Sequence, residues 1–143
     1  MKVKIKRIDK SLALPQYHTS GSVAFDLCAR IQTVVTPFKP TIIPLNIVIQ
    51  TPANYFLALV ARSSLPLKRG LMVANGIGII DKDYCGDKDE IGLQVLNFTD
   101  EDVIVKKGER IAQAMLVKIG KVTEFKEVSS MKAKSRGGFG STG

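Results

Sequence analysis

Apolar and polar residues alternate over short stretches of this chain, and residues typical of turns separate the stretches. At Lys2–Ile8 charged and apolar residues alternate as they do in a half-exposed β-strand. Comparable β-branched stretches predict the other strands: Ala24–Ala29, Thr33–Thr36, Thr41–Gln50, Tyr55–Ala61, Leu71–Ala74, Ile77–Ile80, Glu90–Asn97, Asp102–Lys106, Arg110–Val117 and Lys121–Phe125. Many short strands at this spacing are typical of a sandwich or jelly roll. We therefore expect an all-β fold, a distorted jelly roll or β-barrel.

One short helix is expected within this pattern, from Ser64 to Arg69. Ser63 or Ser64 suits its N-cap, and Pro66 suits its first turn because the missing N–H is not needed there. The length of 143 residues fits one domain. We expect residues 1–130 to form the β-barrel domain and residues 131–143 to form a flexible tail.

The final segment, Gly137–Gly143, contains four glycines in seven residues. Such a composition does not hold a fixed shape without a partner. One interpretation is a frayed terminus. The other is a flap, in which Phe139 stacks on a ring, glycine N–H groups hold an anion and Arg136 pairs with phosphate.

The net charge of the chain limits the kinds of partner that it is expected to bind. A net charge of +8 favours an anionic partner such as a nucleotide, a nucleic acid or an anionic surface. The lysines are scattered, and with no Trp, three Tyr and six Phe the chain is poor in base-stacking aromatics, so we expect no stable nucleic-acid complex. The N-terminus shows no signal peptide, and no run is long enough to span a bilayer. We expect a cytoplasmic protein that does not bind membranes.

Cysteine and histidine are too rare for several kinds of site. Cys28 and Cys85 have neither metal-ligand spacing nor the pattern of a disulfide framework. His18 is the single histidine, which argues against a histidine-based zinc site and against a catalytic triad built around a second histidine.

The stretch Asn75–Gly86 reads Asn-Gly-Ile-Gly-Ile-Ile-Asp-Lys-Asp-Tyr-Cys-Gly. Its apolar run ends in Asp81, and a turn with Tyr84 follows at once. An ionised group at the end of a buried strand is costly unless it has a task. The plain alternative is a hairpin in which Asp81 accepts turn hydrogen bonds.

Five stretches, in order, resemble the five motifs of the trimeric deoxyuridine triphosphatase (dUTPase) family. They are Ser22–Leu27, Ala61–Leu65 with Gly70, Asn75–Gly86, Lys107–Gln113 and Arg136–Gly143. The resemblance runs through nearly the whole chain, and its second, third and fifth motifs are specific.

The chain departs from the family pattern in three places. The first motif has Ala24 and Phe25 where the family usually has Gly and often Tyr. An extra Asp87-Lys88-Asp89 lengthens the turn before Glu90. The tail arginine, Arg136, lies closer to the phenylalanine than is usual, which leaves Lys134 as a substitute for it.

The resemblance implies a dUTPase-like β-barrel that hydrolyses dUTP to dUMP and pyrophosphate, supplying the dTMP precursor and keeping uracil out of DNA. Water would attack the α-phosphorus. Asp81 is the expected general base, since an aspartate of pKa about 4 is already ionised near pH 7. Asp26 is the expected contact to Mg²⁺, through water. The family also implies a homotrimer with active sites at subunit contacts.

The same resemblance implies the substrate contacts. Phosphate contacts are expected from Arg62, Ser63, Ser64, Gln113, Arg136, Gly140, Ser141 and Thr142. The uracil slot is expected at Asn75, Gly78, Ile79, Ile80 and Gly92. Tyr84 would lie under the deoxyribose and exclude a 2′-hydroxyl, and Phe139 would stack on uracil as the tail closes.

Most of these residues also have a purely structural interpretation. Arg62 and Ser63 fit a surface arginine and a helix cap. Asp26 fits an ion pair with a neighbouring basic side chain, Tyr84 a packed hairpin aromatic, and Gln113 a polar residue in an apolar strand.

Three other functions remain open. A dCTP deaminase resembles the chain in fold and in its Arg-Ser-Ser element, but it needs a catalytic glutamate, for which Glu90 is the one candidate, and it normally lacks the glycine-rich tail. A nucleotide-sensing or partner-binding protein on the same fold would keep the pocket. A basic β-barrel that binds nucleic acid would show salt-dependent binding.

Overall fold

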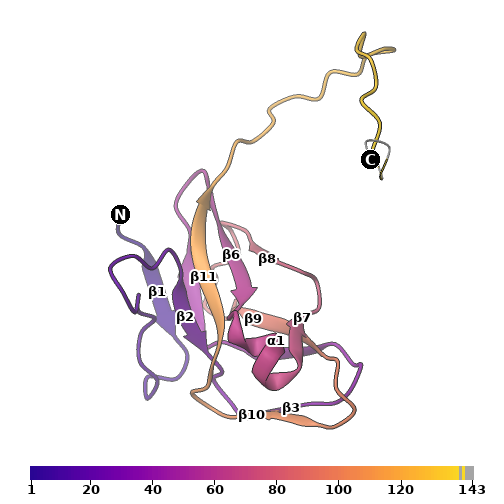
Figure 1. Cartoon of the computed structure of the whole chain (residues 1–143). Helices are drawn as coiled ribbons and strands as arrows, with labels where there is room; N and C mark the ends of the chain where they lie inside the picture. The colour runs from indigo at the N-terminus through magenta and orange to yellow at the C-terminus, as the bar shows by residue number, and fades with distance from the viewer. Residues whose placement is uncertain (139, 141–143) are drawn as a thin grey trace.

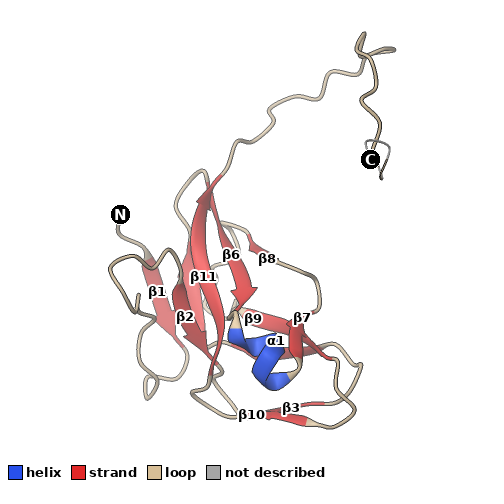
Figure 2. Cartoon of the chain, viewed as in Figure 1, coloured by secondary structure: helices blue, strands red, loops and turns tan. Residues whose placement is uncertain are grey.

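A computed structural model describes residues 1–138 and Gly140, and this part of the chain forms short strands and one helix (Figures 1 and 2). The elements are β1 (Lys4–Arg7), β2 (Phe25–Cys28), β3 (Thr33–Val35), β4 (Thr41–Pro44), β5 (Ile47–Gln50), β6 (Tyr55–Ala61), α1 (Ser64–Arg69), β7 (Leu71–Val73), β8 (Gly78–Ile80), β9 (Gly92–Asn97), β10 (Val103–Val105) and β11 (Arg110–Lys118).

The strands pair into small antiparallel sheets. The larger two have the strand orders β2-β11-β6-β8 and β4-β9-β7, and the smaller two are the pairs β1-β5 and β3-β10. Most neighbours are distant in sequence, so the chain crosses repeatedly between sheets. The expected all-β, jelly-roll-like fold with one short helix is confirmed.

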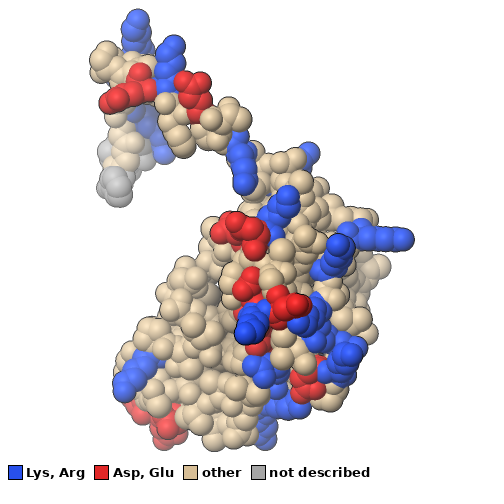
Figure 3. Space-filling view, turned by 180° about the vertical axis from the view of Figure 1, so that it is seen from behind, with Lys and Arg blue, Asp and Glu red and all other residues tan. Residues whose placement is uncertain are grey.

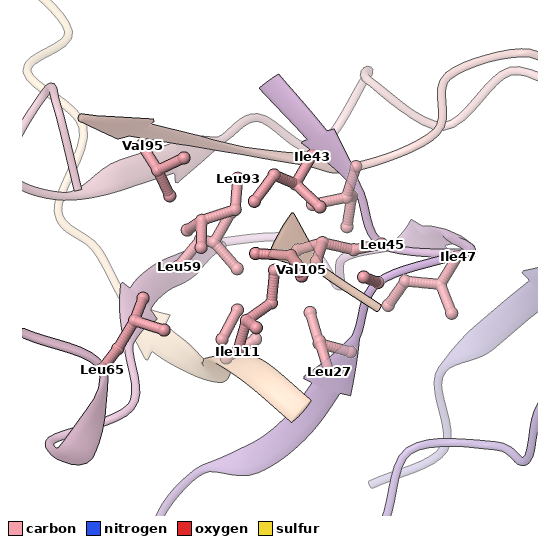
Figure 4. Close-up of a cluster of buried hydrophobic side chains, with 14 of the residues drawn as sticks. Leu27, Ile43, Leu45, Ile47, Leu59, Leu65, Leu93, Val95, Val105 and Ile111 are labelled. Atoms are coloured by element: carbon pink, nitrogen blue, oxygen red, sulfur yellow. The ribbon is translucent and has the colours of Figure 1, made fainter. Parts of the chain in front are cut away.

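Aliphatic side chains of the facing sheets meet in one core (Figure 4). Strand β9 alternates as a half-buried strand should, with Leu93 and Val95 inside and Gln94 outside. Strand β6 is central in its sheet, and Leu57 and Leu59 on it are fully buried. Burying each such side chain contributes about 1.5–3 kcal/mol, so the core is the main source of stability.

Helix α1 has the predicted bounds. Ser63 occupies its N-cap position, but the Ser63 side chain makes no capping hydrogen bond. Gly70 ends the helix with a left-handed backbone (φ 61°), and its N–H donates to the carbonyl of Pro66 at 3.1 Å. Glycine suits this position because a Cβ there would strain the backbone and collide with the Thr99 side chain.

Two predicted strands differ from the structure by more than a shift of one or two residues at their ends. The stretch predicted as one strand from Thr41 to Gln50 is two, β4 and β5, because Asn46 between them has a left-handed backbone (φ 70°). The buried Asn46 side chain accepts from the N–H of Asp9 at 2.6 Å and donates to the Asp9 carbonyl at 3.0 Å. The strand predicted at Lys121–Phe125 is wrong: residues 120–138 are exposed and lie outside every helix and strand.

The chain leaves the body after β11 as an extended segment (Figure 1). The apolar residues of the predicted strand are exposed there, Phe125 by 90% and Val122 by 63%, because no strand among the described residues pairs with them. Within the described residues no helix is long and apolar enough to cross a membrane.

Candidate active site

Three predicted residues from three motifs meet on neighbouring strands. Asp26 of β2 lies opposite Gln113 of β11, and the Gln113 amide donates to Oδ1 of Asp26 at 3.0 Å. Gln113 lies opposite Val60 of β6, and Arg62 directly follows that strand. Nε of Arg62 lies 3.3 Å from Oδ2 of Asp26. We refer to Asp26, Arg62, Arg110 and Gln113 as the phosphate-side cluster.

The carboxylate of Asp26 is surrounded by basic groups. Its side chain is 4% exposed, and Oδ2 lies 3.3 Å from Nη1 of Arg110 and 3.2 Å from Nε2 of His18. A buried carboxylate persists when such groups compensate its charge. Asp26 therefore pairs with basic side chains, as its structural interpretation predicted. Two arginines against one carboxylate leave the cluster net positive, which suits an anionic ligand.

Two of the basic residues around Asp26 were not predicted from the sequence as part of the site. Arg110 belongs to the fourth motif but had no assigned role, and His18 lies in a loop that precedes the first motif. Their side chains contact one another, with 2.6 Å between Nη1 of Arg110 and Nε2 of His18. A basic residue directly before the apolar part of β11 was the available signal for Arg110.

The start of α1 adds hydroxyl groups near Arg62. Ser63 is exposed and Ser64 is half-buried, and the Ser63 hydroxyl is not used as a cap. The helix is fixed to the fourth motif at its other end, where Arg69 pairs with Glu109. The N–H of Arg62 also donates to the carbonyl of Ile111 at 3.3 Å. These contacts hold the second motif against β11.

The third motif forms a separate cleft of about 500 Å³, which we call the base-side cleft. Five predicted residues line it: Ile79, Ile80, Asp81, Tyr84 and Gly92. Its other walls are Ile42, Pro44 and Glu90. Asn75 lies in the turn before β8 and does not line the cleft, and Gly78 packs against β6, where a Cβ would lie 3.0 Å from that of Leu59.

Asp81 and Tyr84 belong to one turn. The N–H of Tyr84 donates to the Asp81 carbonyl at 3.3 Å, and the Tyr84 hydroxyl donates to the carbonyl of Glu90 at 3.2 Å. Asp81 is exposed, and Ile79 in the preceding strand is 61% exposed. The expected buried strand before Asp81 is therefore wrong for the single chain, and the desolvation argument for Asp81 does not apply to it.

The two halves lie at opposite ends of β6. Ile80 pairs with Leu57 near the start of that strand, so Asp81 follows toward Phe56, whereas Arg62 follows the strand's last residue. In Figure 1, β8 runs toward the upper end of β6 and α1 begins at its lower end. Six residues at about 3.3 Å each separate the two positions by about 20 Å. One chain does not bring Asp81 to its own phosphate-side cluster.

The remaining expected site residues lie in the C-terminal tail. Lys134, Arg136 and Gly140 are exposed. The expected contacts Phe139, Ser141 and Thr142 lie outside the described residues. Across residues 1–138 and Gly140, no group of three or more His, Cys, Asp or Glu side chains is arranged to hold a metal ion.

On the face seen in Figure 3, basic and acidic side chains lie beside one another. Ion pairs at the surface of the molecule include Lys6 with Asp87 at 2.8 Å and Lys107 with the half-buried Asp9 at 2.6 Å. A surface of mixed sign gives no support on this face to a continuous nucleic-acid interface.

Comparisons with known proteins identify the family. A family model described as dUTPase matches residues 10–143. The chain is 42% identical over 146 residues to the deoxyuridine 5′-triphosphate nucleotidohydrolase of Hydrogenobaculum sp. (strain Y04AAS1), covering 100% of this chain and 99% of that protein. It is 39% identical over 145 residues to that of Helicobacter pylori (strain J99 / ATCC 700824), covering 100% and 97%. The chain belongs to the dUTPase family.

Solved structures agree on the fold. The crystal structure of dUTPase from Streptococcus mutans matches with a TM-score of 0.77 and 26% identity, over 84% of this chain and 98% of that one. The Staphylococcus bacteriophage 80alpha dUTPase with dUPNHPP matches with a TM-score of 0.86 over 99% and 98%. At 23% identity the second likeness supports the fold alone.

Proposed function

We propose that this protein hydrolyses dUTP to dUMP and pyrophosphate. The observation that carries the proposal is the match to the dUTPase family over residues 10–143. The structure is consistent with it: Asp81 and Tyr84 line one cleft, and the side chains of Arg62 and Gln113 both contact Asp26. The relatives are named for the same reaction. The matches cover the whole of this chain and 99% and 97% of the two relatives.

Asp81 is the general base of the proposed reaction. Its exposed carboxylate accepts a hydrogen bond from a water molecule and orients it toward the α-phosphorus of the nucleotide. The proton of that water passes to Asp81 as the new P–O bond forms, and pyrophosphate leaves with the electrons of the broken P–O bond. Positioning of this water, rather than a covalent intermediate, is the contribution of the chain.

The phosphate-side cluster binds the triphosphate. Arg62 offers forked N–H donors, Gln113 an amide, and Ser63 and Ser64 hydroxyl groups next to it. The positive balance around Asp26 supports this assignment, because each phosphate oxygen replaces water as the partner of a donor that is already in place.

Mg²⁺ fits this cluster as an ion that arrives with the nucleotide. Oδ2 of Asp26 is buried and has ion-pair contacts to Arg62 and Arg110, but among the described residues it accepts no hydrogen bond, so it can accept one from a metal-bound water. Asp26 is the one residue that would hold the ion, through its water shell. When bound, Mg²⁺ neutralises charge on the phosphates.

The base-side cleft accepts the nucleoside. Ile79, Ile80 and Gly92 form its walls, and the backbone N–H and C=O groups of β8 match the donor and acceptor edge of uracil. A slot built on such groups rejects a base with the wrong edge, because buried polar groups would be left unpaired. Tyr84 packs against the deoxyribose. Asn75 and Gly78 shape this hairpin from outside the cleft.

The active enzyme is proposed to be a homotrimer with active sites at subunit contacts. The separation of about 20 Å between Asp81 and Arg62 along β6 supports this assembly, because a site with both needs a second chain. Ile42 and Ile79 are apolar walls of the base-side cleft and are 66% and 61% exposed, which leaves them to be covered by a neighbour.

Residues 131–143 are proposed to close the site as a tail, separate from the barrel of residues 1–130. The tail contributes Phe139 over uracil and Arg136, Gly140, Ser141 and Thr142 to the phosphates. The exposed, extended course of the chain beyond β11 supports this role, because it can reach another subunit.

Two observations disfavour two of the other functions, the deaminase and the nucleic-acid-binding barrel. Glu90, the candidate base of a dCTP deaminase, forms a two-point ion pair with Arg30, so its carboxylate is already occupied. The mixed charge seen in Figure 3 does not favour a nucleic-acid interface.

The proposal is tested by measuring pyrophosphate release from dUTP, dTTP, dCTP and UTP in separate reactions with the purified full-length protein. We expect dUTP alone to react well. Equal release from all four nucleotides would contradict the uracil slot, and ammonia release from dCTP would identify a deaminase.

A further inference from the structure

Glu90 connects the base-side cleft to two distant parts of the chain. Its carboxylate accepts from Nε of Arg30 at 2.7 Å and from Nη2 at 2.8 Å. Oε1 also accepts from the backbone N–H of Asn46 at 2.8 Å. The Glu90 side chain is 16% exposed and that of Arg30 28%. A forked, partly buried ion pair of this kind fixes geometry better than an exposed one.

The backbone of Glu90 holds Tyr84. The Tyr84 hydroxyl donates to the Glu90 carbonyl at 3.2 Å, whereas the Tyr84 side chain is 44% exposed and so is not fixed by burial. The extra residues Asp87–Asp89 lie between the two. This loop has a turn of its own, in which the N–H of Glu90 donates to the Lys88 carbonyl at 2.9 Å. The contacts of the Glu90 side chain to Arg30 and Asn46 then fix the end of the turn to the rest of the chain.

We propose that Glu90 is a positioning residue that sets the discrimination between deoxyribose and ribose. Held by Arg30 and Asn46, it fixes the carbonyl that restrains the Tyr84 hydroxyl, and the restrained ring excludes a 2′-hydroxyl. This inference rests on the proposed hydrolysis of dUTP and adds a specificity determinant to it. Arg30 contributes through Glu90, without touching the substrate.

The same hairpin supplies a matched control. Lys6 pairs with Asp87 at 2.8 Å, but these side chains are 49% and 90% exposed. Exposed ion pairs contribute little because water and salt screen them. Asp87→Asn should therefore leave the discrimination unchanged, although Asp87 is nearer to Tyr84 in sequence than Glu90 is.

The test is kcat/KM of the full-length protein for dUTP and for UTP. The variants are Tyr84→Phe, Glu90→Gln, Arg30→Met and the double variant Tyr84→Phe/Glu90→Gln, with Asp87→Asn as the control. Losing one hydrogen bond should lower the dUTP/UTP ratio about five-fold in Tyr84→Phe and in Glu90→Gln. The double variant should fall no further than either single one, because both changes remove the same restraint. Arg30→Met should lower the ratio in the same direction.

Two results would overturn the inference. One is an unchanged ratio in both Glu90→Gln and Arg30→Met while the wild type hydrolyses dUTP; the other is an additive fall in the double variant. Thermal melting of each variant shows whether it folds, and Arg30→Met, which removes the partner of the Glu90 carboxylate, keeps the test valid if Glu90→Gln does not fold. A wild-type protein that leaves dUTP intact would instead overturn the proposed function, and this inference with it.

Discussion

Asp81 and Arg62 lie near opposite ends of β6: Asp81 follows Ile80, which pairs with Leu57 near the start of that strand, and Arg62 follows its last residue and leads into α1. In the proposed mechanism each chain therefore carries two half-sites rather than one site. The carboxylate proposed to orient water belongs to one half and the arginine proposed to bind phosphate to the other. The proposal then requires that the half-sites of two chains face each other.

Replacing Asp81 by Asn should lower kcat by about 10²–10⁴-fold, since the amide keeps the shape but cannot take the proton. KM for dUTP should change little. Because Asp81 is exposed, the melting temperature should stay that of the wild type. Steady-state pyrophosphate release measures the loss.

The matched control is Asp83→Asn. Asp83 is exposed in the same turn and outside the proposed machinery. It should retain wild-type turnover. Activity of Asp81→Asn within ten-fold of the wild type, or an equal loss in Asp83→Asn, would remove Asp81 from its role.

A chain that ends at Ser135 should lose most of its turnover, about a hundred-fold, because it lacks the donors that close on the phosphates. Its stability should not change, since residues 120–138 are exposed and lie outside the helix and strands. Activity assays and melting curves on the same preparation distinguish the two effects. Unchanged turnover would exclude the tail from the mechanism.

Local signals in the sequence were enough to predict the helix and most strands. Pro66 in the first turn and Gly70 after the last residue determine both ends of α1. The break at Asn46 was missed because it depends on hydrogen bonds to Asp9, far away in sequence. The strand predicted at Lys121–Phe125 has suitable residues, but in the part of the chain that the structure describes no strand pairs with it.

In the candidate site, too, local motifs were predictable from the sequence and contacts between distant segments were not. Its chemistry was predicted from motifs, and the structure places Asp26, Arg62 and Gln113 together because β2, β11 and β6 are neighbours. An ion pair of Asp26 with a basic side chain was predicted, but its partners His18 and Arg110 were not, since they come from segments brought together only by folding. The opposite placement of Asp81 and Arg62 likewise depends on strand register.

Gly70→Ala should destabilise the protein by about 1–3 kcal/mol, because the left-handed backbone disfavours a Cβ and the Thr99 side chain occupies its place. Gly21→Ala is the control: nothing lies within 4 Å of its Cβ. Urea unfolding measures both. In a Thr99→Ser background, which removes the colliding methyl group, Gly70→Ala should cost less; an equal cost would contradict the collision.

Acid should weaken the contact between Asp9 and Lys107. The Lys107 ammonium, 2.6 Å away, and the hydrogen bonds from Ser11 hold the pKa of Asp9 well below its ordinary value of 3.8. A depressed pKa in the folded state stabilises the protein above pH 3.8, and this stabilisation is lost as the pH falls below that value toward the folded pKa. The difference in unfolding free energy between wild type and Lys107→Met should therefore shrink from pH 7 to pH 3. An equal difference at both pH values would contradict this linkage.

The most direct test of the account is to mix two inactive variants, Asp81→Asn and Arg62→Gln, after unfolding and refolding them together. In mixed trimers some sites combine an intact Asp81 from one chain with an intact Arg62 from its neighbour. We predict that an equal mixture recovers about a quarter of the wild-type dUTP hydrolysis, because random assembly makes about that share of sites intact. A mixture as inactive as its components would contradict a site shared between chains.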